Sequence, residues 1–274
     1  MIRELVRSAN ERGEESLVIT FWPHPRNVLQ DDARNLRLLT SLKEKKLHLS
    51  ALGVDWVEVM TFSREFSKMT TEEYLRDIVR GRFGASTIVL GYDNRLGSDL
   101  LSPDETEAIA LSLGLDVIRT PRGLEASSTM IRNALQDGRI EDANAMLGYG
   151  YSLDGVVVAG NRLGRTIGFP TANMQLYEPL KLIPSDGVYA VEVETLGKRF
   201  RGMCNIGVRP TVSSGEHRTV ETHILDFDED IYGLDIRITF LRKLRDERPF
   251  PSLEALREQL KRDETDVLRV FALK

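Results

Sequence analysis

The densest group of residues that could bind phosphate lies between positions 160 and 173. Three glycines and two arginines precede Pro170-Thr171-Ala172-Asn173. Backbone amides can approach phosphate oxygens closely around glycine, because no side chain intervenes. In an extended segment Thr171 and Asn173 point to the same side, and hard oxygen ligands of this kind suit Mg²⁺ that bridges nucleotide phosphates. The pattern predicts a Mg²⁺-nucleotide loop. An ordinary glycine-rich hairpin explains it equally well, since the glycine spacing matches neither a P-loop nor a dinucleotide fingerprint.

A single carboxylate, Glu221, stands in the middle of an expected strand at 219–227. It shares one strand face with His223 and Leu225 and has apolar neighbours. A glutamate in such a place can act as a general base toward a hydroxyl nucleophile. Local chemistry alone favours the simpler explanation, a strand face exposed to solvent. The charged run at 242–248 is most simply a solvated surface as well.

Two kinds of framework must position these residues. In residues 1–148, short apolar runs alternate with amphipathic stretches, which is typical of a parallel α/β sheet with right-handed crossovers. Ser41 with Glu44 fits a capping box, and Thr71 is suited to cap the helix that follows it. The expected strands are 17–22, 56–62, 86–92 and a short one near 117–118, and the expected helices are 41–52, 71–81, 103–113, 128–136 and 140–147.

The periodicity changes near residue 148. From Tyr151 onward, apolar residues recur at every second position, which predicts a small antiparallel barrel. An amphipathic helix is expected after the barrel, at 252–270. We therefore expect one domain at 1–148 and a second at 149–274. The barrel strands that this period predicts are 151–158, 187–194, 199–206, 219–227 and 235–242.

Composition restricts the class of protein. Hydrophobic residues make up 41% and charged residues 29% of the chain, which is typical of a soluble globular protein, and a net charge of −5 argues against a nucleic-acid partner. The one cysteine, Cys204, is expected to be a buried, inert thiol, and the spacing of the histidines matches no zinc motif. No apolar run approaches the roughly 18 residues of a membrane span. We expect a cytoplasmic protein with small-molecule substrates and no membrane partner, and weak homo-oligomerisation stays open.

Five segments of the second half, in order, closely resemble the riboflavin kinase signature of the prokaryotic bifunctional riboflavin kinase/FAD synthetase family. They lie at 164–173, 181–190, 205–211, 221–227 and 240–247 and span most of residues 150–265. The resemblance implies a six-stranded antiparallel barrel that transfers the γ-phosphate of ATP to the 5′-hydroxyl of riboflavin, which makes FMN.

The resemblance also implies roles for individual residues. The family's threonine and asparagine hold Mg²⁺-ATP, which indicates Thr171 and Asn173 as ligands of Mg²⁺ and ATP. Its glutamate accepts the proton of the riboflavin hydroxyl, which indicates Glu221 as the catalytic base. Arg245 resembles part of a flap on the flavin side. The glycine-rich segment that covers the phosphates corresponds to Gly164, Arg165 and Gly168.

The first half resembles the same family's FMN adenylyltransferase domain, a nucleotidyltransferase-type parallel α/β fold that converts FMN to FAD. The matching segments are 20–26, 39–45, 91–97 and 127–132. A helix that begins at 128 can receive ATP phosphates at its N-terminus, and the serines and threonine there serve equally well as an N-cap. The nucleotide and flavin ligands that the resemblance implies are His24, Asp93, Arg95, Ser128, Thr129 and Arg132.

The family's opening segment has no counterpart in this sequence. It is a strand followed by a His-x-Gly-His stretch whose histidines stabilise the pyrophosphate being made, and residues 1–7 look like the helix that comes after it. The segments after Gly97 and before Ser127 also look short. Either the protein is naturally truncated or the segment exists in the complete protein. We expect the second, because loss of a central parallel strand would expose edge groups and apolar surface.

Three functions fit these residues. The leading one is a bifunctional enzyme that makes FMN and then FAD from riboflavin and ATP. The second is a riboflavin kinase with a degenerate first domain, and the third is a non-catalytic module that binds a flavin or a nucleotide. The set of Thr171, Asn173 and Glu221 argues against the third, because a binding module needs no base.

Overall fold

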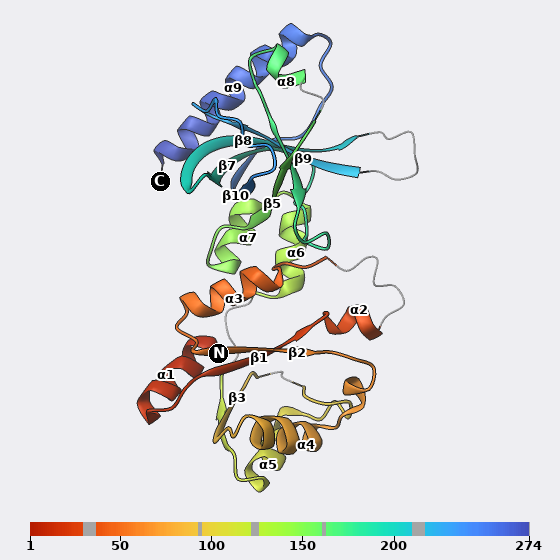
Figure 1. Cartoon of the computed structure of the whole chain (residues 1–274), viewed down its shortest axis with the longest axis vertical. Coiled ribbons are helices and arrows are strands. Elements are labelled where there is room, and N and C mark those ends of the chain that lie inside the picture. The colour runs from red at the N-terminus through yellow and green to blue at the C-terminus, as the bar shows by residue number, and fades with distance from the viewer. Residues whose placement is uncertain (30–36, 93–94, 122–125, 161–162, 210–216, 274) are drawn as a thin grey trace. The chain divides into compact units, whose positions relative to one another are not determined.

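The computed structural model describes residues 1–29, 37–92, 95–121, 126–160, 163–209 and 217–273 (Figure 1). The chain forms two compact units. The first consists of Met1–Leu36 and Thr40–Glu125, and the second consists of Arg37–Leu39 and Ala126–Lys274. The predicted site residue Asp93 lies outside the described residues.

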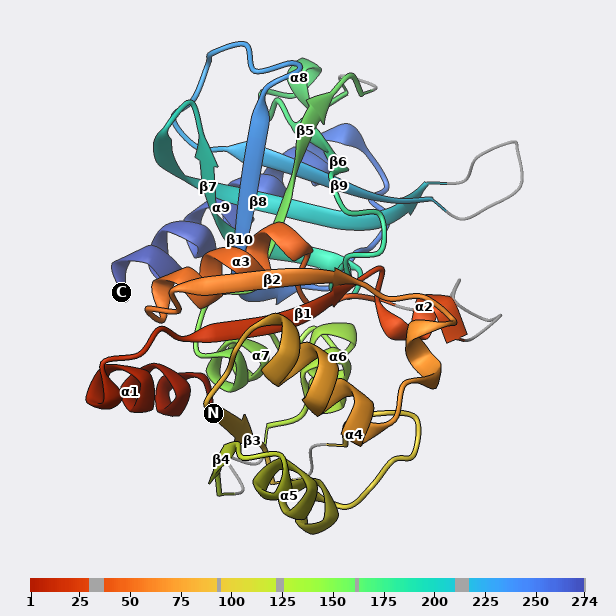
Figure 2. The ribbon, with the colours of Figure 1, turned by 60° about the horizontal axis from the view of Figure 1, so that its bottom comes forward.

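The first unit is built from parallel strands and the helices around them (Figure 2). The helix after Ser41 begins at the predicted capping box, with Glu44 as the reciprocal partner. The predicted cap at Thr71 is wrong by one residue. Thr70 forms the capping box with Glu73, because the Thr71 hydroxyl is buried and hydrogen-bonded inside the unit. The elements are α1 (Ile2–Arg12), β1 (Leu17–Trp22), α2 (Pro25–Leu29), α3 (Leu42–Ala51), β2 (Trp56–Thr61), η2 (Phe66–Lys68), α4 (Thr71–Glu73), the π-helical η3 (Tyr74–Arg82), β3 (Thr87–Leu90), α5 (Pro103–Ser112) and β4 (Asp116–Arg119).

The parallel strands form two separate two-stranded sheets in the described part of the chain. β1 pairs with β2, from Leu17 beside Trp56 to Trp22 beside Thr61, and β3 pairs with β4. A cavity of about 690 Å³ is lined largely by apolar residues, including residues of both β1 and β3. The expected parallel strands are confirmed, although they do not form one continuous sheet.

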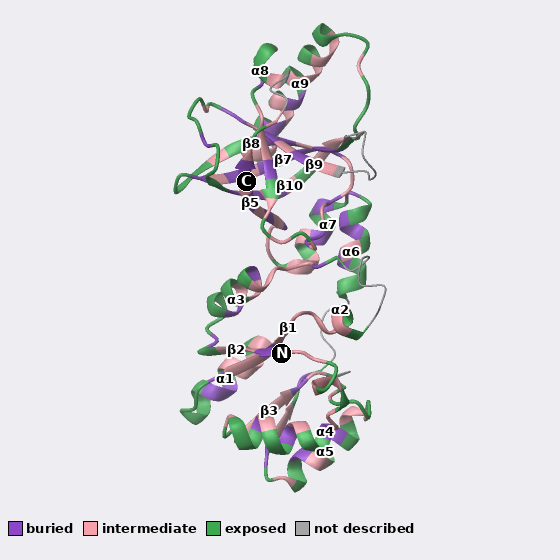
Figure 3. Cartoon of the chain, turned by 45° about the vertical axis from the view of Figure 1, so that its right-hand side comes forward, coloured by how far each residue is buried: buried purple, intermediate pink, exposed green. Residues whose placement is uncertain are grey.

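The second unit is a closed barrel with two helices before it and one after it. Its elements are α6 (Ser128–Gln136), α7 (Ile140–Leu147), β5 (Ser152–Val158), α8 (Leu163–Thr166), β6 (Ala172–Leu176), β7 (Gly187–Thr195), β8 (Lys198–Arg209), β9 (His217–Ile224), β10 (Asp235–Arg245) and α9 (Leu253–Ala272). The strand order is β10-β5-β6-β9-β8-β7, and neighbouring strands are antiparallel. Along β5, Leu153 and Val157 are buried and alternate with less buried residues, and Figure 3 shows buried residues gathered in the barrel strands. The predicted six-stranded barrel is confirmed.

Helix α9 covers one side of the barrel, where it contacts β7, β8 and β10. Ser252 caps the helix at the predicted position by accepting a hydrogen bond from Ala255 N. Val267 is fully buried in a small apolar cluster with Met203 of β8 and Phe169 of the glycine-rich segment. No helix of the described residues, α9 included, combines the length and the apolarity needed to cross a membrane.

Two segments outside the barrel strands are held to the barrel by hydrogen bonds. Asn144 of α7 donates to Phe240 O at 2.9 Å and accepts from Tyr151 N at 2.7 Å. Leu38 forms a parallel bridge with Lys181. These contacts explain why residues 126–147 and 37–39 belong to the same compact unit as the barrel.

Candidate active site

Three neighbouring strands place polar side chains in a row across the barrel wall. Glu221 on β9 pairs directly with Asn173 on β6 and with Asn205 on β8. Residues that pair directly on antiparallel strands present their side chains on the same face. Just before β6, Thr171 donates its hydroxyl to Glu221 Oε2 at 3.4 Å. The structure brings together the predicted Thr171, Asn173 and Glu221, and it adds Asn205, which no local pattern singles out.

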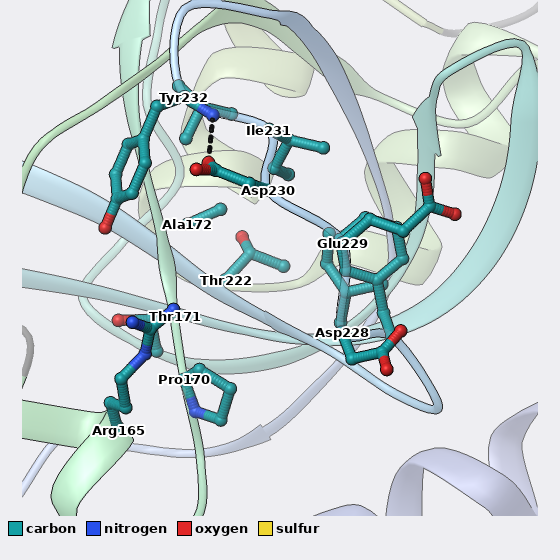
Figure 4. A pocket seen from close by; sticks show the side chains of 13 residues that line it. Arg165, Pro170, Thr171, Ala172, Thr222, Asp228, Glu229, Asp230, Ile231 and Tyr232 are labelled. Atoms are coloured by element: carbon teal, nitrogen blue, oxygen red, sulfur yellow. Dashed lines mark hydrogen bonds between the residues drawn. The ribbon is translucent and has the colours of Figure 1, made fainter.

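A first cavity, of about 90 Å³, is lined by residues around the start of β6 and by the loop after β9 (Figure 4). Arg165, Pro170 and Thr171 line one side of it, and Asp228 and Glu229 line another. The first side carries a cation and a hydroxyl donor, whereas the acidic loop offers hydrogen-bond acceptors. The cavity therefore has two ends of opposite electrostatic character.

A second cavity, of about 380 Å³, is lined by residues of the barrel wall and of α9. Its volume lies within the range of small-molecule sites. Leu256 and Leu260 of α9 and Met203 of β8 contribute to an apolar lining, and Glu221 is among the polar groups. Thr171 lines both cavities, so this threonine marks the place where they meet.

The glycine-rich segment holds its shape through its own backbone. Phe169 N donates to Gly164 O at 2.8 Å, and a β-carbon at Gly164 would overlap the carbonyl oxygen of Phe169. Gly168 has a φ of +87°, a conformation that side chains other than glycine rarely adopt. The two glycines thus allow the segment to fold back on itself, with Arg165 inside the loop and Thr171 shortly after it. Contact of this loop with phosphate stays a prediction.

His223 anchors the same segment, a role that is not predicted from the sequence. Its Nδ1 lies 2.8 Å from Pro170 O. Its ring meets the Phe169 ring edge-on, with 5.2 Å between the centroids. The signal available in the sequence is its place two residues after Glu221, on the same strand face.

The charged run at 242–248 is only in part the solvated surface that its composition suggests. Asp246 is 88% exposed, but Arg245 is 18% exposed and forms an ion pair with the buried Asp263 of α9. Arg245 also lines the second cavity. The simple interpretation is therefore wrong for Arg245, because α9 packs over it, and its flavin-side role stays a prediction.

The residues expected to bind nucleotide and flavin in the first half fall in both units. His24 and Arg95 belong to the first unit, whereas Ser128, Thr129 and Arg132 belong to the second, at the start of α6. Their ligand roles stay predictions.

The start of α6 shows which residue caps the helix. Ser127 Oγ accepts a hydrogen bond from Met130 N at 3.2 Å, so the N-cap interpretation is confirmed for this serine. Ser128 and Thr129 are exposed. Arg132 Nε donates to Arg37 O at 3.1 Å.

Two groups, the half-buried Lys45 and the buried Cys204, have shifted protonation equilibria. Burial lowers the pKa of Lys45, whose Nζ donates to Thr20 Oγ1 at 3.0 Å, and both residues lie in segments that carry the family resemblance. Burial raises the pKa of Cys204 to about 12. This confirms the expected buried thiol, which is protonated at neutral pH.

A parallel α/β unit and a six-stranded barrel, with a carboxylate and a hydroxyl where two cavities meet, define the class of this protein as a two-unit transferase. Residues 1–130 match the model of the FAD synthetase family, and residues 147–271 match that of the riboflavin kinase family. The bifunctional riboflavin kinase/FMN adenylyltransferase of Bacillus subtilis is 34% identical over 271 residues, which are 96% of this chain and 85% of that protein. The protein of the same name from Escherichia coli K12 is 36% identical over 284 residues, with 99% and 88% covered.

The fold has a solved counterpart as well. A crystal structure described as a macrolide-efflux protein from Streptococcus pneumoniae has a TM-score of 0.84 and 32% identity, and the match covers 96% of this chain and 88% of that one. The chain therefore belongs to the bifunctional riboflavin kinase/FMN adenylyltransferase family.

Proposed function

We propose that residues 149–274 phosphorylate riboflavin to FMN and that the domain to which residues 1–148 belong adenylylates FMN to FAD when its opening segment is present, with ATP as the co-substrate of both reactions. The observation that carries the first activity is the position of Thr171, which lines both cavities and lies 3.4 Å from Glu221. A phosphoryl donor in one cavity and a hydroxyl acceptor in the other would meet at this place.

Charge around the first cavity would orient ATP, of which a cavity of about 90 Å³ encloses only a part. The carboxylates at 228–230 repel phosphate and accept hydrogen bonds, so they suit the hydroxyls and amino group of the nucleoside. Arg165 suits the phosphates, because charge-assisted hydrogen bonds to phosphate are strong. This orientation directs the γ-phosphate toward Thr171 and away from the acidic loop.

Riboflavin would occupy the second cavity, with its ring system against the apolar lining and its 5′-hydroxyl near Glu221. Glu221 accepts the proton of this hydroxyl while the hydroxyl oxygen bonds to the γ-phosphorus. The bond from the γ-phosphorus to its bridging oxygen breaks, and ADP leaves with the bonding electrons. Positioning and neutralisation of phosphate charge supply most of the rate, and the base supplies a smaller share.

Thr171 and Asn173 fit a Mg²⁺ ion by the chemistry of their side chains. A hydroxyl and an amide oxygen are hard ligands, and Mg²⁺ usually takes one or two protein ligands together with phosphate oxygens and water. Both residues lie beside Glu221. When bound, Mg²⁺ would neutralise part of the phosphate charge.

For the second activity, support comes from the match of residues 1–130 to the FAD synthetase family. The exposed residues at the start of α6 add a physical argument, because the amides and dipole of a helix N-terminus attract anions. The proposed ligands of nucleotide and flavin are His24, Asp93, Arg95, Ser128, Thr129 and Arg132.

The test is incubation of the full chain with riboflavin, Mg²⁺ and ATP, followed by chromatographic separation of the flavins. Formation of FMN and FAD supports both activities. Formation of FMN alone supports the kinase and shows that residues 1–148 do not adenylylate FMN without the opening segment, a result that a second incubation with FMN and ATP checks directly. If neither product forms, both activities are excluded and a flavin- or nucleotide-binding module becomes the better explanation.

A further inference from the structure

A buried carboxylate on α9 binds the arginine that lines the second cavity. Asp263 is 1% exposed. Its two oxygens accept hydrogen bonds from Arg245 Nε at 3.0 Å and from Arg245 Nη2 at 2.8 Å. Gln259, one turn earlier, donates its Nε2 to Asp263 at 2.8 Å. A forked pair of this kind holds a guanidinium in one orientation.

The third nitrogen of Arg245 also has a protein partner. Nη1 donates to Asp246 O at 3.1 Å. Every nitrogen of the guanidinium is therefore hydrogen-bonded to the protein, and Asp263 balances its charge. What Arg245 offers the cavity is a fixed flat surface rather than a mobile cation.

Two further residues extend this surface. The Phe250 ring centroid lies 5.6 Å from Arg245 Cζ and 5.3 Å from Arg248 Cζ. Arg248 Nη2 donates to Gln259 Oε1 at 2.7 Å, so Gln259 links Arg248 to Asp263. Arg245, Arg248 and Phe250 all line the second cavity, whereas Asp263 does not.

We propose that Asp263 is a positioning residue for riboflavin that acts through Arg245, an inference that rests on the riboflavin kinase function proposed above. By fixing and balancing the Arg245 guanidinium, Asp263 lets this side chain present a planar face with neutralised charge to a planar, uncharged ring system. Without this carboxylate, Arg245 would be an unbalanced cation in the cavity and would favour an anionic ligand. FMN differs from riboflavin by a phosphate. The ion pair therefore also favours the uncharged substrate over its charged product.

The test compares Asp263→Asn with a matched control in the full chain. Asp154 on β5 accepts hydrogen bonds from Arg237 Nε at 2.6 Å and Nη2 at 3.0 Å, and it lines neither cavity. Asp154→Asn thus breaks a similar forked pair elsewhere on the barrel. The measurements are the KM for riboflavin, the KM for ATP and the inhibition constant of FMN.

In Asp263→Asn the KM for riboflavin should rise about tenfold or more, because a displaced binding group commonly costs this much. The KM for ATP should stay within about twofold, since Asp263 and Arg245 lie outside the lining of the first cavity. The inhibition constant of FMN should not rise in parallel, so the preference for riboflavin over FMN falls. Asp154→Asn should leave this preference unchanged. A normal KM for riboflavin, or an equal loss of riboflavin and FMN binding, would overturn the inference.

A second variant keeps the inference testable where Asp263→Asn does not fold. Arg245→Lys retains a cation opposite Asp263 but removes the planar fork, so the KM for riboflavin should rise again, and an unchanged KM would count against the proposal. Failure of the proposed kinase function looks different, because the wild-type chain would then form no FMN at all.

Discussion

Thr171 Oγ1 and Glu221 Oε2 lie 3.4 Å apart, and the threonine lines both cavities of the barrel unit. The threonine hydroxyl suits a phosphate or its Mg²⁺, and the carboxylate suits the proton of a substrate hydroxyl. In the proposed reaction these would be the donor and acceptor sides of the phosphoryl transfer. Two of the predictions below separate such a site from a polar patch on a barrel wall.

Replacement of Glu221 by Gln should lower kcat for FMN formation by roughly 10²–10⁴ with little change in riboflavin affinity, because the amide keeps the shape but cannot accept the proton. Steady-state kinetics and riboflavin titration measure the two effects. Glu194→Gln is the control, since Glu194 is a strand carboxylate that pairs with Arg199 at 3.1 Å and lines neither cavity. Near-normal turnover in Glu221→Gln would exclude this residue as the base.

Replacement of Asn173 by Ala should raise the KM for Mg²⁺-ATP by about 10–100-fold, because one proposed oxygen ligand is lost. Excess Mg²⁺ should restore part of the activity, and a titration of rate against free Mg²⁺ measures this. Asn144→Ala is the control. Asn144 links α7 to the barrel through Tyr151 and Phe240, so its loss should lower stability and leave the Mg²⁺ dependence normal. An Asn173→Ala enzyme with wild-type Mg²⁺ dependence would argue against the ligand role.

The sequence predicts those parts of the fold whose signals are local. The period of two predicts the longer barrel strands, and the Ser41 capping box marks the start of α3. β6 is not predicted from periodicity, because Ala172–Leu176 has five residues and includes Asn173 and Gln175. The choice between two adjacent threonines as a helix cap depends on which of them is buried by distant residues, and the sequence does not contain that information locally.

The site depends on pairs that lie far apart in the chain. Thr171 and Glu221 are separated by 50 positions, and Arg245 and Asp263 by 18. Within the charged run, composition does not distinguish Arg245 from Arg242. Only the packing of α9 over the barrel buries Arg245 and leaves Arg242 exposed. Local chemistry therefore predicts a solvated surface for the whole run, and only the family resemblance singles out Arg245 as a site residue.

Replacement of Lys181 by Met should lower the free energy of unfolding of the second unit by about 1–3 kcal/mol. Lys181 is buried, its Nζ donates to Leu39 O at 2.7 Å, and it lies 4.7 Å from the Tyr151 ring centroid. Methionine keeps the apolar stem and loses both interactions. Urea denaturation followed by circular dichroism measures the change.

The two units can be followed separately in that experiment. Both tryptophans of the chain, Trp22 and Trp56, lie in the first unit. Their fluorescence therefore follows unfolding of that unit, and Lys181→Met should not directly lower its stability. Lys261→Met is the control, because Lys261 is 53% exposed and pairs with Glu258 on the surface, and it should change stability by less than about 1 kcal/mol. Equal stability of Lys181→Met and the control would contradict the prediction.

The buried thiol of Cys204 should make the barrel less stable at alkaline pH. Its pKa is raised to about 12 by burial, whereas an unfolded cysteine ionises near pH 8.5. Above about pH 8.5 the unfolded state therefore loses this proton before the folded state does. Stability is fully present below that pH and falls as pH rises toward 12, by about 2 kcal/mol at pH 10.

Cys204→Ala isolates this contribution. Urea denaturation at pH 7, 8.5 and 10 should show a steeper alkaline loss in the wild-type chain than in the variant. Burial also raises the pKa of Tyr189 to about 12, and Cys204 adds to this shift, so the contribution of Tyr189 cancels only in part in the difference. Labelling supplies a second readout. The buried native thiol is protonated at pH 7, so alkylation of Cys204 should follow unfolding of the barrel. Parallel alkaline curves, or rapid labelling of the native chain, would show that the thiol is accessible to solvent.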